Sequence, residues 1–470
     1  MAETKLRAGD IVEGEIDDLA YGGAGVLRAE GWVVMVRGAF PGDRARVRLG
    51  RRRKGLFEGH LEEILSPSRD RIRPACPHLA ICGGCALQGL DPTAQTRYKS
   101  HQAAELLRRI GGIEPEDIAS PWASPDPYYY RNKMEFTFAS RAWLTREQLE
   151  AGTPFAPGPA LGLHPRGVFQ GVFDVTDCRL QSPLSNRVVE AMRSIARARD
   201  LDAYRSRADQ GLLRHLVIRQ AATTRDLIVI LVVRSEHPDL PDIARELKAA
   251  VPEISGIVAS VNLRRATVAQ GDYDVPLLGE TSWQETLHGL TFRIGAASFF
   301  QTQTRGGEAL IEEALVQGGF GSRDRVLDLY CGIGAFSLPL ARQVDSVLGV
   351  EIQERAIVEA RANARANGIE NARFQAGPVE ARESHPWEAK GAWDAVLIDP
   401  PRSGLHPRAL EKVLGLDAGR IVYVSCNPST LARDAGHLVA EGGYRARRLR
   451  VFDLFPQTPH LESVLILEHP

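Results

Sequence analysis

The chain has little of the features that would place it in a specialised class. It has only six cysteines in 470 residues, too few and too scattered for a disulfide framework in a chain this long. Its 58 lysines and arginines nearly balance its 59 aspartates and glutamates, and the net charge is −1. This balance excludes a global basic field of the kind that attracts nucleic acid. Any nucleic-acid partner must therefore be bound through local basic patches.

Long apolar runs are also missing. No stretch approaches the roughly 18 apolar residues that a membrane span requires, and the first residues, Met-Ala-Glu-Thr-Lys, lack the apolar core of a signal peptide. The hydrophobic fraction of 44% and the charged fraction of 25% are ordinary for soluble globular proteins. We expect a soluble, cytoplasmic protein with no membrane partner, and the length predicts about three domains.

The first 66 residues are typical of a small β-barrel. Their short alternating segments, separated by glycine turns, suit a five-stranded barrel of the oligonucleotide-binding kind. The densest basic cluster of the chain runs from Arg44 to Lys54 and predicts contact with nucleic acid, with a solvated positive loop as the alternative. The predicted strands are residues 10–16, 25–27, 32–36 and 44–48.

Three cysteines crowd together after this part, as Cys76, Cys82 and Cys85, with two glycines between the last two. Cys178 stands apart. In a reducing compartment such crowding indicates metal ligation, because the Gly-Gly pair lets the backbone wrap around a metal centre. Zinc and an iron–sulfur cluster are both compatible with four thiolates.

Residues 67–290 predict an α+β middle domain. Residues 92–111 are predicted to form one amphipathic helix, and strands at 213–218, 227–233 and 256–262 accompany helices at 184–198 and 240–250. The segment 128–136 interleaves aromatic and basic residues, as base-stacking surfaces do, although tyrosines on a strand are as often core residues.

From residue 291 strands and helices alternate regularly, which indicates a parallel, doubly wound sheet. The end departs from this pattern, because segments 446–452 and 463–467 have no helix between them and should form a β-hairpin. After the strand 325–330, Gly332 and Gly334 form a tight turn, and Glu351 ends the next strand about twenty residues on. A dinucleotide site would need a third glycine near Ser337, so the pattern favours an S-adenosylmethionine site.

Cys426 ends an apolar strand, and the chain then turns at Asn427-Pro428 into a helix. This places a thiol at the carboxyl edge of the sheet, and we expect the helix N-terminus to favour the thiolate. A core cysteine is the alternative. Asp399-Pro-Pro-Arg402 closes a strand at the same edge; adenine amino-methylases carry an aromatic residue where this chain has Arg402.

Together these motifs resemble the RNA uracil carbon-5 methyltransferase family, in the branch with an N-terminal TRAM domain and an iron–sulfur cluster. The resemblance spans essentially the whole chain. It implies a multidomain α/β protein: a TRAM barrel at 1–66, a central cluster-bearing domain with RNA contacts at 67–290, and a Rossmann-like methyltransferase sheet at 291–470. The motifs are Gly22–Gly25, Pro41–Asp43, the four cysteines, Phe299–Gln301, Asp328–Gly334, Asp399–Arg402, Ser425–Pro428 and His460–Val464.

The resemblance also implies roles for individual residues. Cys426 would be the nucleophile and Glu462 the general base. The S-adenosylmethionine contacts would be Gln301, Tyr330, Glu351 and Asp399, together with the turn at Gly332 and Gly334. The four cysteines, Cys76, Cys82, Cys85 and Cys178, would hold a four-iron, four-sulfur cluster. Two positions depart from the common family pattern, which often has asparagine where this chain has Ala335 and Gln303.

The implied substrate is a uridine in 23S ribosomal RNA, with a T-loop uridine of transfer RNA as the alternative. A non-catalytic iron–sulfur RNA-binding protein with a vestigial methylase domain is a further alternative, but Cys426, Glu462 and Asp399 are all present. A radical methylase would need a Cys-x3-Cys-x2-Cys triad, whereas the spacing here is Cys-x5-Cys-x2-Cys. No obligate protein partner is evident.

Overall fold

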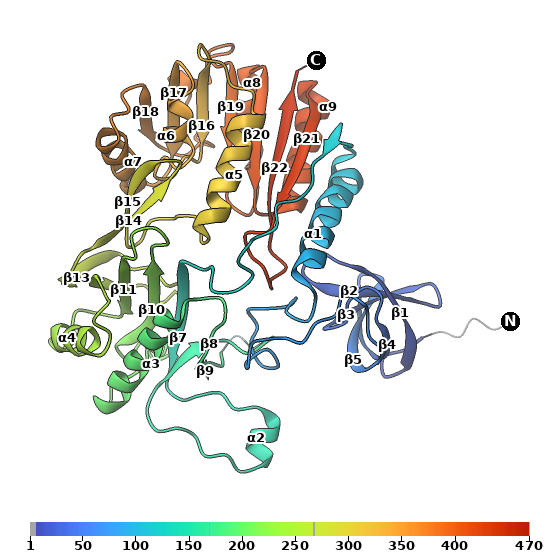
Figure 1. Cartoon of the computed structure of the whole chain (residues 1–470), viewed down its shortest axis with the longest axis vertical. Coiled ribbons are helices and arrows are strands. Elements are labelled where there is room, and N and C mark those ends of the chain that lie inside the picture. The colour runs from blue at the N-terminus through green and yellow to red at the C-terminus, as the bar shows by residue number, and fades with distance from the viewer. Residues whose placement is uncertain (1–5, 169, 267, 470) are drawn as a thin grey trace. The chain divides into compact units, whose positions relative to one another are not determined.

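The computed structural model describes residues 6–168, 170–266 and 268–469. It divides into two compact units that do not follow chain order (Figure 1). The first unit comprises Met1–Ala75, Cys85–Pro127 and Asp399–Pro470, and the second comprises Cys76–Gly84 and Tyr128–Ile398. This grouping by packing does not test the division into three consecutive domains, which stays a prediction.

The first unit begins with a closed five-stranded barrel in the order β1-β2-β3-β5-β4, which confirms the predicted barrel. Alternate residues of each strand fill its core, among them Ile16, Leu27, Val34 and Val47. Its fifth strand, which follows the turn at Gly55, had no separate prediction. The strands are β1 (Ile11–Leu19), β2 (Ala24–Ala29), β3 (Trp32–Arg37), β4 (Arg44–Arg53) and β5 (Leu56–Ser66).

The basic cluster of the barrel lies on β4 and is partly neutralised from within. Arg46 pairs with Glu13 of β1 at 2.8 Å and with Glu63 of β5, and Arg48 pairs with Glu62. These exposed pairs add little stability, but they reduce the positive field that the arginine count suggests.

Helix α1 (Pro92–Leu106) follows an Asp91 N-cap, whose carboxylate accepts from the Thr93 and Ala94 amides. The predicted single helix over 92–111 is right up to Leu106; residues Leu107–Gly111 widen into a π-helical turn that ends at Gly112, with φ of +64°. The buried face of this helix is polar rather than apolar. Its buried polar residues are Gln95, Thr96, Lys99 and Gln102.

The remainder of the first unit comprises the short strand β6 and the C-terminal part of the chain. The predicted hairpin is confirmed, since β21 and β22 pair antiparallel and β22 also pairs with β20. A short strand, β6, adds in parallel to the outer edge of β21. The elements are β6 (Asp117–Ile118), α8 (Pro407–Leu416), β20 (Arg420–Ser425), α9 (Pro428–Gly442), β21 (Arg445–Phe452) and β22 (Glu462–Glu468).

The second unit contains the parallel strands β18, β17, β16 and β19, in that order, with helices in the connections (Figure 1). Strands β16, β17 and β19 are apolar and buried along most of their length, as expected for a sheet covered on both faces, whereas the edge strand β18 buries only Phe374. The elements are α5 (Thr304–Gln317), β16 (Arg325–Leu329), α6 (Ser337–Ala341), β17 (Ser346–Glu351), α7 (Glu354–Ala366), β18 (Ala372–Ala376), a 3₁₀ turn (Pro386–Glu388) and β19 (Ala395–Ile398).

The same unit holds a seven-stranded, mostly antiparallel sheet in the order β13-β12-β11-β10-β7-β8-β9. It matches the predicted α+β pattern. Its strands are β7 (Lys133–Ala139), β8 (Ala160–Leu163), β9 (Phe173–Asp174), β10 (Leu213–Gln220), β11 (Leu227–Val233), β12 (Gly256–Val261) and β13 (Tyr273–Gly279), and the helices of this region are α2 (Arg146–Glu150), α3 (Pro183–Ala198) and α4 (Leu240–Ala250). Strands β14 (Ser282–Leu287) and β15 (Leu290–Gly295) pair with each other in a separate two-stranded sheet.

The aromatic segment 128–136, which leads into β7, contains both buried and exposed side chains. Met134 and Phe136 are core residues of the sheet, whereas Tyr129 is 41% exposed and lies under the Arg179 guanidinium. The core alternative therefore holds for the strand, and Tyr129 is the exposed aromatic residue of the segment.

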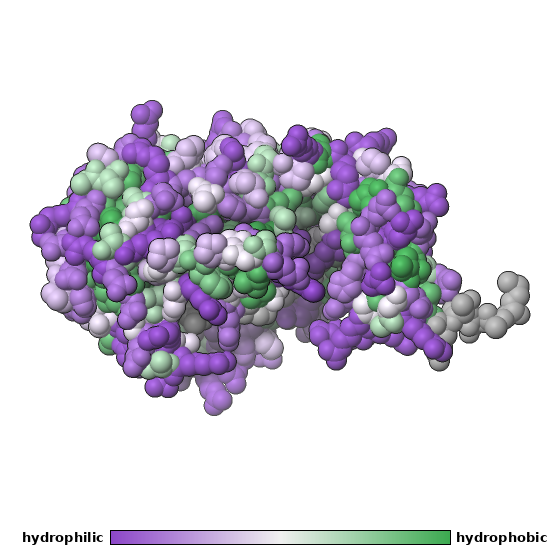
Figure 2. Space-filling view, turned by 90° about the horizontal axis from the view of Figure 1, so that it is seen from below, coloured by the Kyte–Doolittle hydropathy of each residue, from purple (hydrophilic) through white to green (hydrophobic). Residues whose placement is uncertain are grey.

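The surface is mostly hydrophilic on the face that Figure 2 shows, with small hydrophobic patches between charged residues. No helix in the described part of the chain combines the length and the apolar content needed to cross a bilayer.

The buried ion pair of the first unit gives a stability prediction. Lys99 Nζ lies 2.5 Å from Asp453 Oδ1, and both side chains are 1% exposed. Burial lowers the pKa of Lys99, and the Asp453 charge opposes that shift. Lys99→Met would leave a buried carboxylate without its cation, and we expect the free energy of unfolding to fall by about 3–5 kcal/mol.

Urea unfolding measures this loss. Arg46→Met is the control, because it removes only exposed ion pairs, those with Glu13 and Glu63, and should cost less than about 1 kcal/mol. Equal small losses in the two variants would contradict the prediction.

Candidate active site

Cys426 follows directly after β20, where the chain leaves the sheet. Residues Ile421 to Ser425 are buried, and partial exposure begins at Cys426. Asn427 then caps α9, since its side-chain oxygen accepts from the Ser429 amide at 3.1 Å. Cys426 thus lies at the end of the strand and is partly exposed.

Glu462 is placed beside this point by strand register. In the antiparallel pair of β20 and β22, Ser425 lies opposite Ser463, and the Ser463 hydroxyl donates to the Ser425 carbonyl at 3.1 Å. One step further along each strand brings Cys426 and Glu462 to the same edge. Glu462 is only 5% exposed.

The Asp399–Arg402 segment is tied to the same edge. The Asn427 side-chain amide donates to the Arg402 carbonyl at 2.9 Å. On its other side, the Arg402 guanidinium lies 3.5 Å from Nδ1 of His460. The turn after β20, the Asp399–Arg402 segment and the segment before Glu462 therefore converge within the first unit.

Burial and the charges around Cys426 correct the expectation that its thiol is held as the thiolate. Burial, followed by the charges of Glu462 and Asp399, raises the pKa of Cys426 to about 12, and Arg402 only partly opposes this. The thiol is therefore protonated at neutral pH in the protein alone. The prediction that the helix N-terminus would favour the thiolate is wrong for this state, because desolvation and two nearby carboxyls outweigh it.

The two carboxyl groups are shifted in the same direction. Burial, followed by the charge of Asp399, holds the pKa of Glu462 well above its ordinary value. Burial alone raises the pKa of Asp399 to about 7. Asp399 therefore gains and loses its proton near neutral pH, and perturbed pKa values of this kind are typical of functional sites.

Tyr21 is a residue that the sequence reasoning missed. It lies in the turn between β1 and β2, and its pKa is raised by burial, lowered by Arg402 and raised by Cys426 and Glu462. These electrostatic neighbours place the phenol near the cysteine, although the residues are about four hundred positions apart in the chain. The only signal available was an aromatic residue within a glycine-rich turn.

The glycine turn of the second unit follows β16. Tyr330, Gly332 and Gly334 all have positive φ, of +66°, +54° and +85°. A Cβ at Gly334 would meet the Phe374 ring at 3.3 Å, whereas no atom lies within 4 Å of the position a Cβ would take at Gly332. The turn is therefore packed at one glycine and open at the other, which leaves room for a ligand against the backbone.

Glu351, at the end of β17, is fixed beside this turn. Its carboxylate accepts from the Gly332 amide at 3.2 Å and from the Gln353 amide at 2.9 Å. The backbone carbonyl of Gln301 accepts from the Asn132 side chain at 2.8 Å, and Gln301 is 9% exposed. The structure thus brings Glu351 to the turn, while the ligand roles of these residues stay predictions.

Three of the four predicted cluster cysteines belong to the second unit. Cys82 Sγ accepts from the Gly84 amide at 3.3 Å, and Cys76 Sγ accepts from the His78 amide at 3.4 Å. Cys178 is buried, and its burial raises the pKa of its thiol to about 11. The charges of Cys82 and Cys76 contribute to this rise in pKa. Cys85 belongs to the first unit and is also buried.

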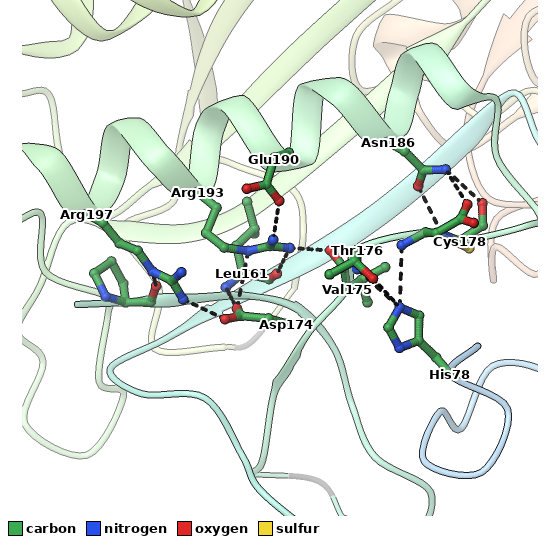
Figure 3. A network of polar contacts seen from close by, with 12 residues as sticks. His78, Leu161, Asp174, Val175, Thr176, Cys178, Asn186, Glu190, Arg193 and Arg197 are labelled. Atoms are coloured by element: carbon green, nitrogen blue, oxygen red, sulfur yellow. Dashed lines mark hydrogen bonds and ion pairs between the residues drawn. The ribbon is translucent and has the colours of Figure 1, made fainter. Parts of the chain in front are cut away.

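The loop of Cys178 is held by a polar network (Figure 3). Asn186 of α3 accepts from the Cys178 amide at 3.0 Å and donates to the Cys178 carbonyl at 3.2 Å. His78 Nε2 accepts from the Thr176 amide at 3.1 Å, which ties the Cys76 segment to the same loop. Even so, the residues that the structure describes contain no group of three or more His, Cys, Asp or Glu side chains arranged to hold a metal ion.

The chain is similar to known proteins in sequence and in fold. The family model described as tRNA (Uracil-5-)-methyltransferase matches residues 281–382 and 389–470. An RNA methyltransferase of Chlorobaculum tepidum is 37% identical over 99% of this chain and 98% of its own length. One of Halalkalibacterium halodurans is 34% identical over 99% and 98%.

A solved structure is similar over nearly the whole chain. The tRNA (uracil-54, C5)-methyltransferase of Pyrococcus abyssi, in complex with S-adenosyl-L-homocysteine, matches with a TM-score of 0.73 and 28% identity, covering 97% of this chain and 99% of that one. The sequence matches and the shared fold indicate the same family. The chain belongs to the RNA uracil-5-methyltransferase family.

Proposed function

We propose that the protein methylates carbon 5 of a uridine in RNA through a covalent bond between Cys426 and the pyrimidine ring. The observation that carries this proposal is the register of β20 and β22, which sets Cys426 and Glu462 at one edge. A nucleophile and a base side by side are what this substitution requires.

The chemistry explains why both groups are needed. Carbon 5 of uracil is too weak a nucleophile to take a methyl group from a sulfonium unaided. Addition of the Cys426 thiolate to carbon 6 moves the electron pair of the ring double bond toward carbon 5 and the carbon-4 carbonyl. Carbon 5 then takes the methyl group, the Glu462 carboxylate removes the hydrogen from carbon 5, and the reformed double bond expels the thiolate.

The resting protonation of the site bears on this sequence. With the pKa of Cys426 at about 12, the thiol must lose its proton before it adds to the ring. Arg402 lowers the pKa of Cys426 and so favours the thiolate.

S-adenosylmethionine supplies the electrophilic methyl group when bound. We propose that it is held by Gln301, Tyr330, Glu351 and the glycine turn, with Asp399 completing the set. The open space at Gly332 and the fixed carboxylate of Glu351 support this, and so does the bound S-adenosyl-L-homocysteine of the Pyrococcus abyssi enzyme. Ala335 lacks the hydrogen-bonding side chain of an asparagine, a loss worth about 1 kcal/mol.

The RNA substrate has two candidates. The TRAM-like barrel together with the cysteine pattern favours 23S ribosomal RNA, whereas the similar Pyrococcus abyssi enzyme acts on uridine 54 of transfer RNA. In either RNA the uridine must be extruded from a folded structure to reach Cys426. Mapping 5-methyluridine in RNA from a deletion strain distinguishes the two. A vestigial domain is disfavoured because the cysteine and the glutamate are both in place.

We also propose that Cys76, Cys82, Cys85 and Cys178 hold a four-iron, four-sulfur cluster. The amide-to-sulfur hydrogen bonds at Cys76 and Cys82 support this, since such bonds stabilise thiolate ligands, and Asn186 fixes the loop of Cys178. The methylation needs no electron transfer. The cluster would therefore have a structural role and hold together the segments that carry the four cysteines.

Cys426→Ala tests the nucleophile. With RNA that carries 5-fluorouridine and with cofactor, the native protein should form a covalent adduct that survives a denaturing gel, because fluorine blocks the final elimination. The variant should form none, and its methylation rate should fall at least about a thousandfold. Ser429→Ala, on the same helix, should behave as the native protein. Full activity in Cys426→Ala would refute the assignment.

Glu462→Gln tests the base. The amide keeps the shape of the side chain but cannot take a proton, so adduct formation should continue while turnover falls by about a hundredfold or more. The covalent species should then accumulate even with ordinary uridine. Glu468→Gln, at the far end of β22, is the control. If Glu462→Gln turns over at the native rate, another group is the base.

Iron and sulfide analysis tests the cluster. Anaerobically purified protein should contain about four iron atoms per chain, with visible absorbance that Cys178→Ser abolishes. Cys331→Ser, outside the proposed ligand set, should keep its iron. Native protein that contains zinc, or no metal, would show that the cluster assignment is wrong.

A further inference from the structure

We propose that Tyr21, from the N-terminal barrel, belongs to the catalytic site and donates a hydrogen bond from its hydroxyl to the carbon-4 oxygen of the target pyrimidine. The proposal rests on the proposed function and adds a residue to it. It makes the barrel part of the chemistry rather than only a module that grips RNA.

The turn that carries Tyr21 is tightly built. The Ala20 amide donates to the Ala24 carbonyl at 2.9 Å, and the Gly23 amide donates to the Ala20 carbonyl at 2.9 Å. Gly22 and Gly23 have φ of +100° and +83°, which side chains other than glycine rarely adopt. These hydrogen bonds and the two glycines therefore fix the backbone of the turn at Tyr21.

The turn is also anchored to the rest of the first unit. The carbonyl of Leu19 accepts from the Gln102 side chain of α1 at 2.6 Å, and the Leu19 side chain packs with Leu87 and Leu90. A Cβ at Gly23 would lie 3.3 Å from Cβ of Pro459. Pro459 precedes Glu462 by three residues, so the turn packs directly against the segment that delivers the base.

The hydroxyl of Tyr21 has an unusual environment. Its oxygen is shielded from solvent and lacks a hydrogen bond of ordinary geometry among the described residues. The Arg402 guanidinium lowers the pKa of Tyr21 by a side-chain hydrogen bond, but a guanidinium only donates, so the phenol proton is left without an acceptor. Buried polar groups in this condition are exceptions that need an explanation. The charged or ionisable groups that act on it are Arg402, Cys426 and Glu462. A buried donor beside the nucleophile and the base is explained if its partner is the substrate.

The reaction has an atom that needs such a donor. When the Cys426 thiolate adds to carbon 6, the displaced electron pair spreads onto the carbon-4 oxygen, and a hydrogen bond to that oxygen stabilises the charge as it develops. Burial raises the pKa of Tyr21, so the phenol keeps its proton and acts as a donor. No proton needs to leave Tyr21 in this role.

Tyr21→Phe tests the proposal, because it removes the hydroxyl and keeps the ring. We expect the single-turnover rate of adduct formation with 5-fluorouridine RNA to fall at least tenfold. The dissociation constant for the same RNA should change less than twofold. The urea midpoint of unfolding should change by less than its experimental error. Tyr98→Phe, which removes a tyrosine hydroxyl from α1 of the same unit, should leave the adduct rate unchanged.

Each other outcome overturns the proposal. An adduct rate equal to the native rate means that the hydroxyl does not touch the ring. A rate that falls together with RNA affinity or stability means that Tyr21 acts through packing. Native protein that forms no adduct at all means that the proposed function itself fails, which separates the two hypotheses.

Discussion

The ion pair between Lys99 and Asp453 is the constraint on which the site depends. Asp453 opens the segment that leads to Glu462, and Lys99 Nζ reaches both its carboxylate and the carbonyl of Phe455, at 3.1 Å. Two buried charges are costly to remove from water, and they are tolerated only where geometry satisfies both. The pair therefore anchors the segment from Asp453 to Glu462 against α1. The buried face of α1 is polar because Lys99 and its neighbours supply the partners of this segment.

A second contact completes this support. The Gln457 amide donates to the Gln95 side chain at 2.7 Å, and Gln457 adopts a φ of +72°, which is uncommon for a residue with a side chain. Surrounding hydrogen bonds must hold such a residue in place. The carbonyl of Gln457 in turn accepts from the amides of Ala86 and Leu87, directly after Cys85. Helix α1 thus connects the barrel, the cysteine segment and the segment that carries the base.

Much of the fold was predictable because periodicity reports burial locally. The strands at 227–233 and 346–350 and the helix at 240–250 were predicted almost to the residue, and the C-terminal hairpin followed from the missing helix between its strands. The burial of polar side chains on α1 was not predictable from the sequence. A lysine such as Lys99 is expected to face solvent unless its partner, Asp453, is known to lie opposite it. The protonated state of Cys426 was missed for the same reason: a sequence shows the helix after the thiol but not the carboxyls around it.

The family, the candidate nucleophile and base, and the glycine turn with its distal acid follow from the residues alone, because these are short motifs whose residue types carry the chemistry. The folded chain was needed to show that Cys426 and Glu462 share a strand edge, that Tyr21 of the barrel lies near them, and that burial raises the pKa of the thiol. Register, desolvation and contacts between distant segments depend on what packs against each group, and no local pattern of residues records that.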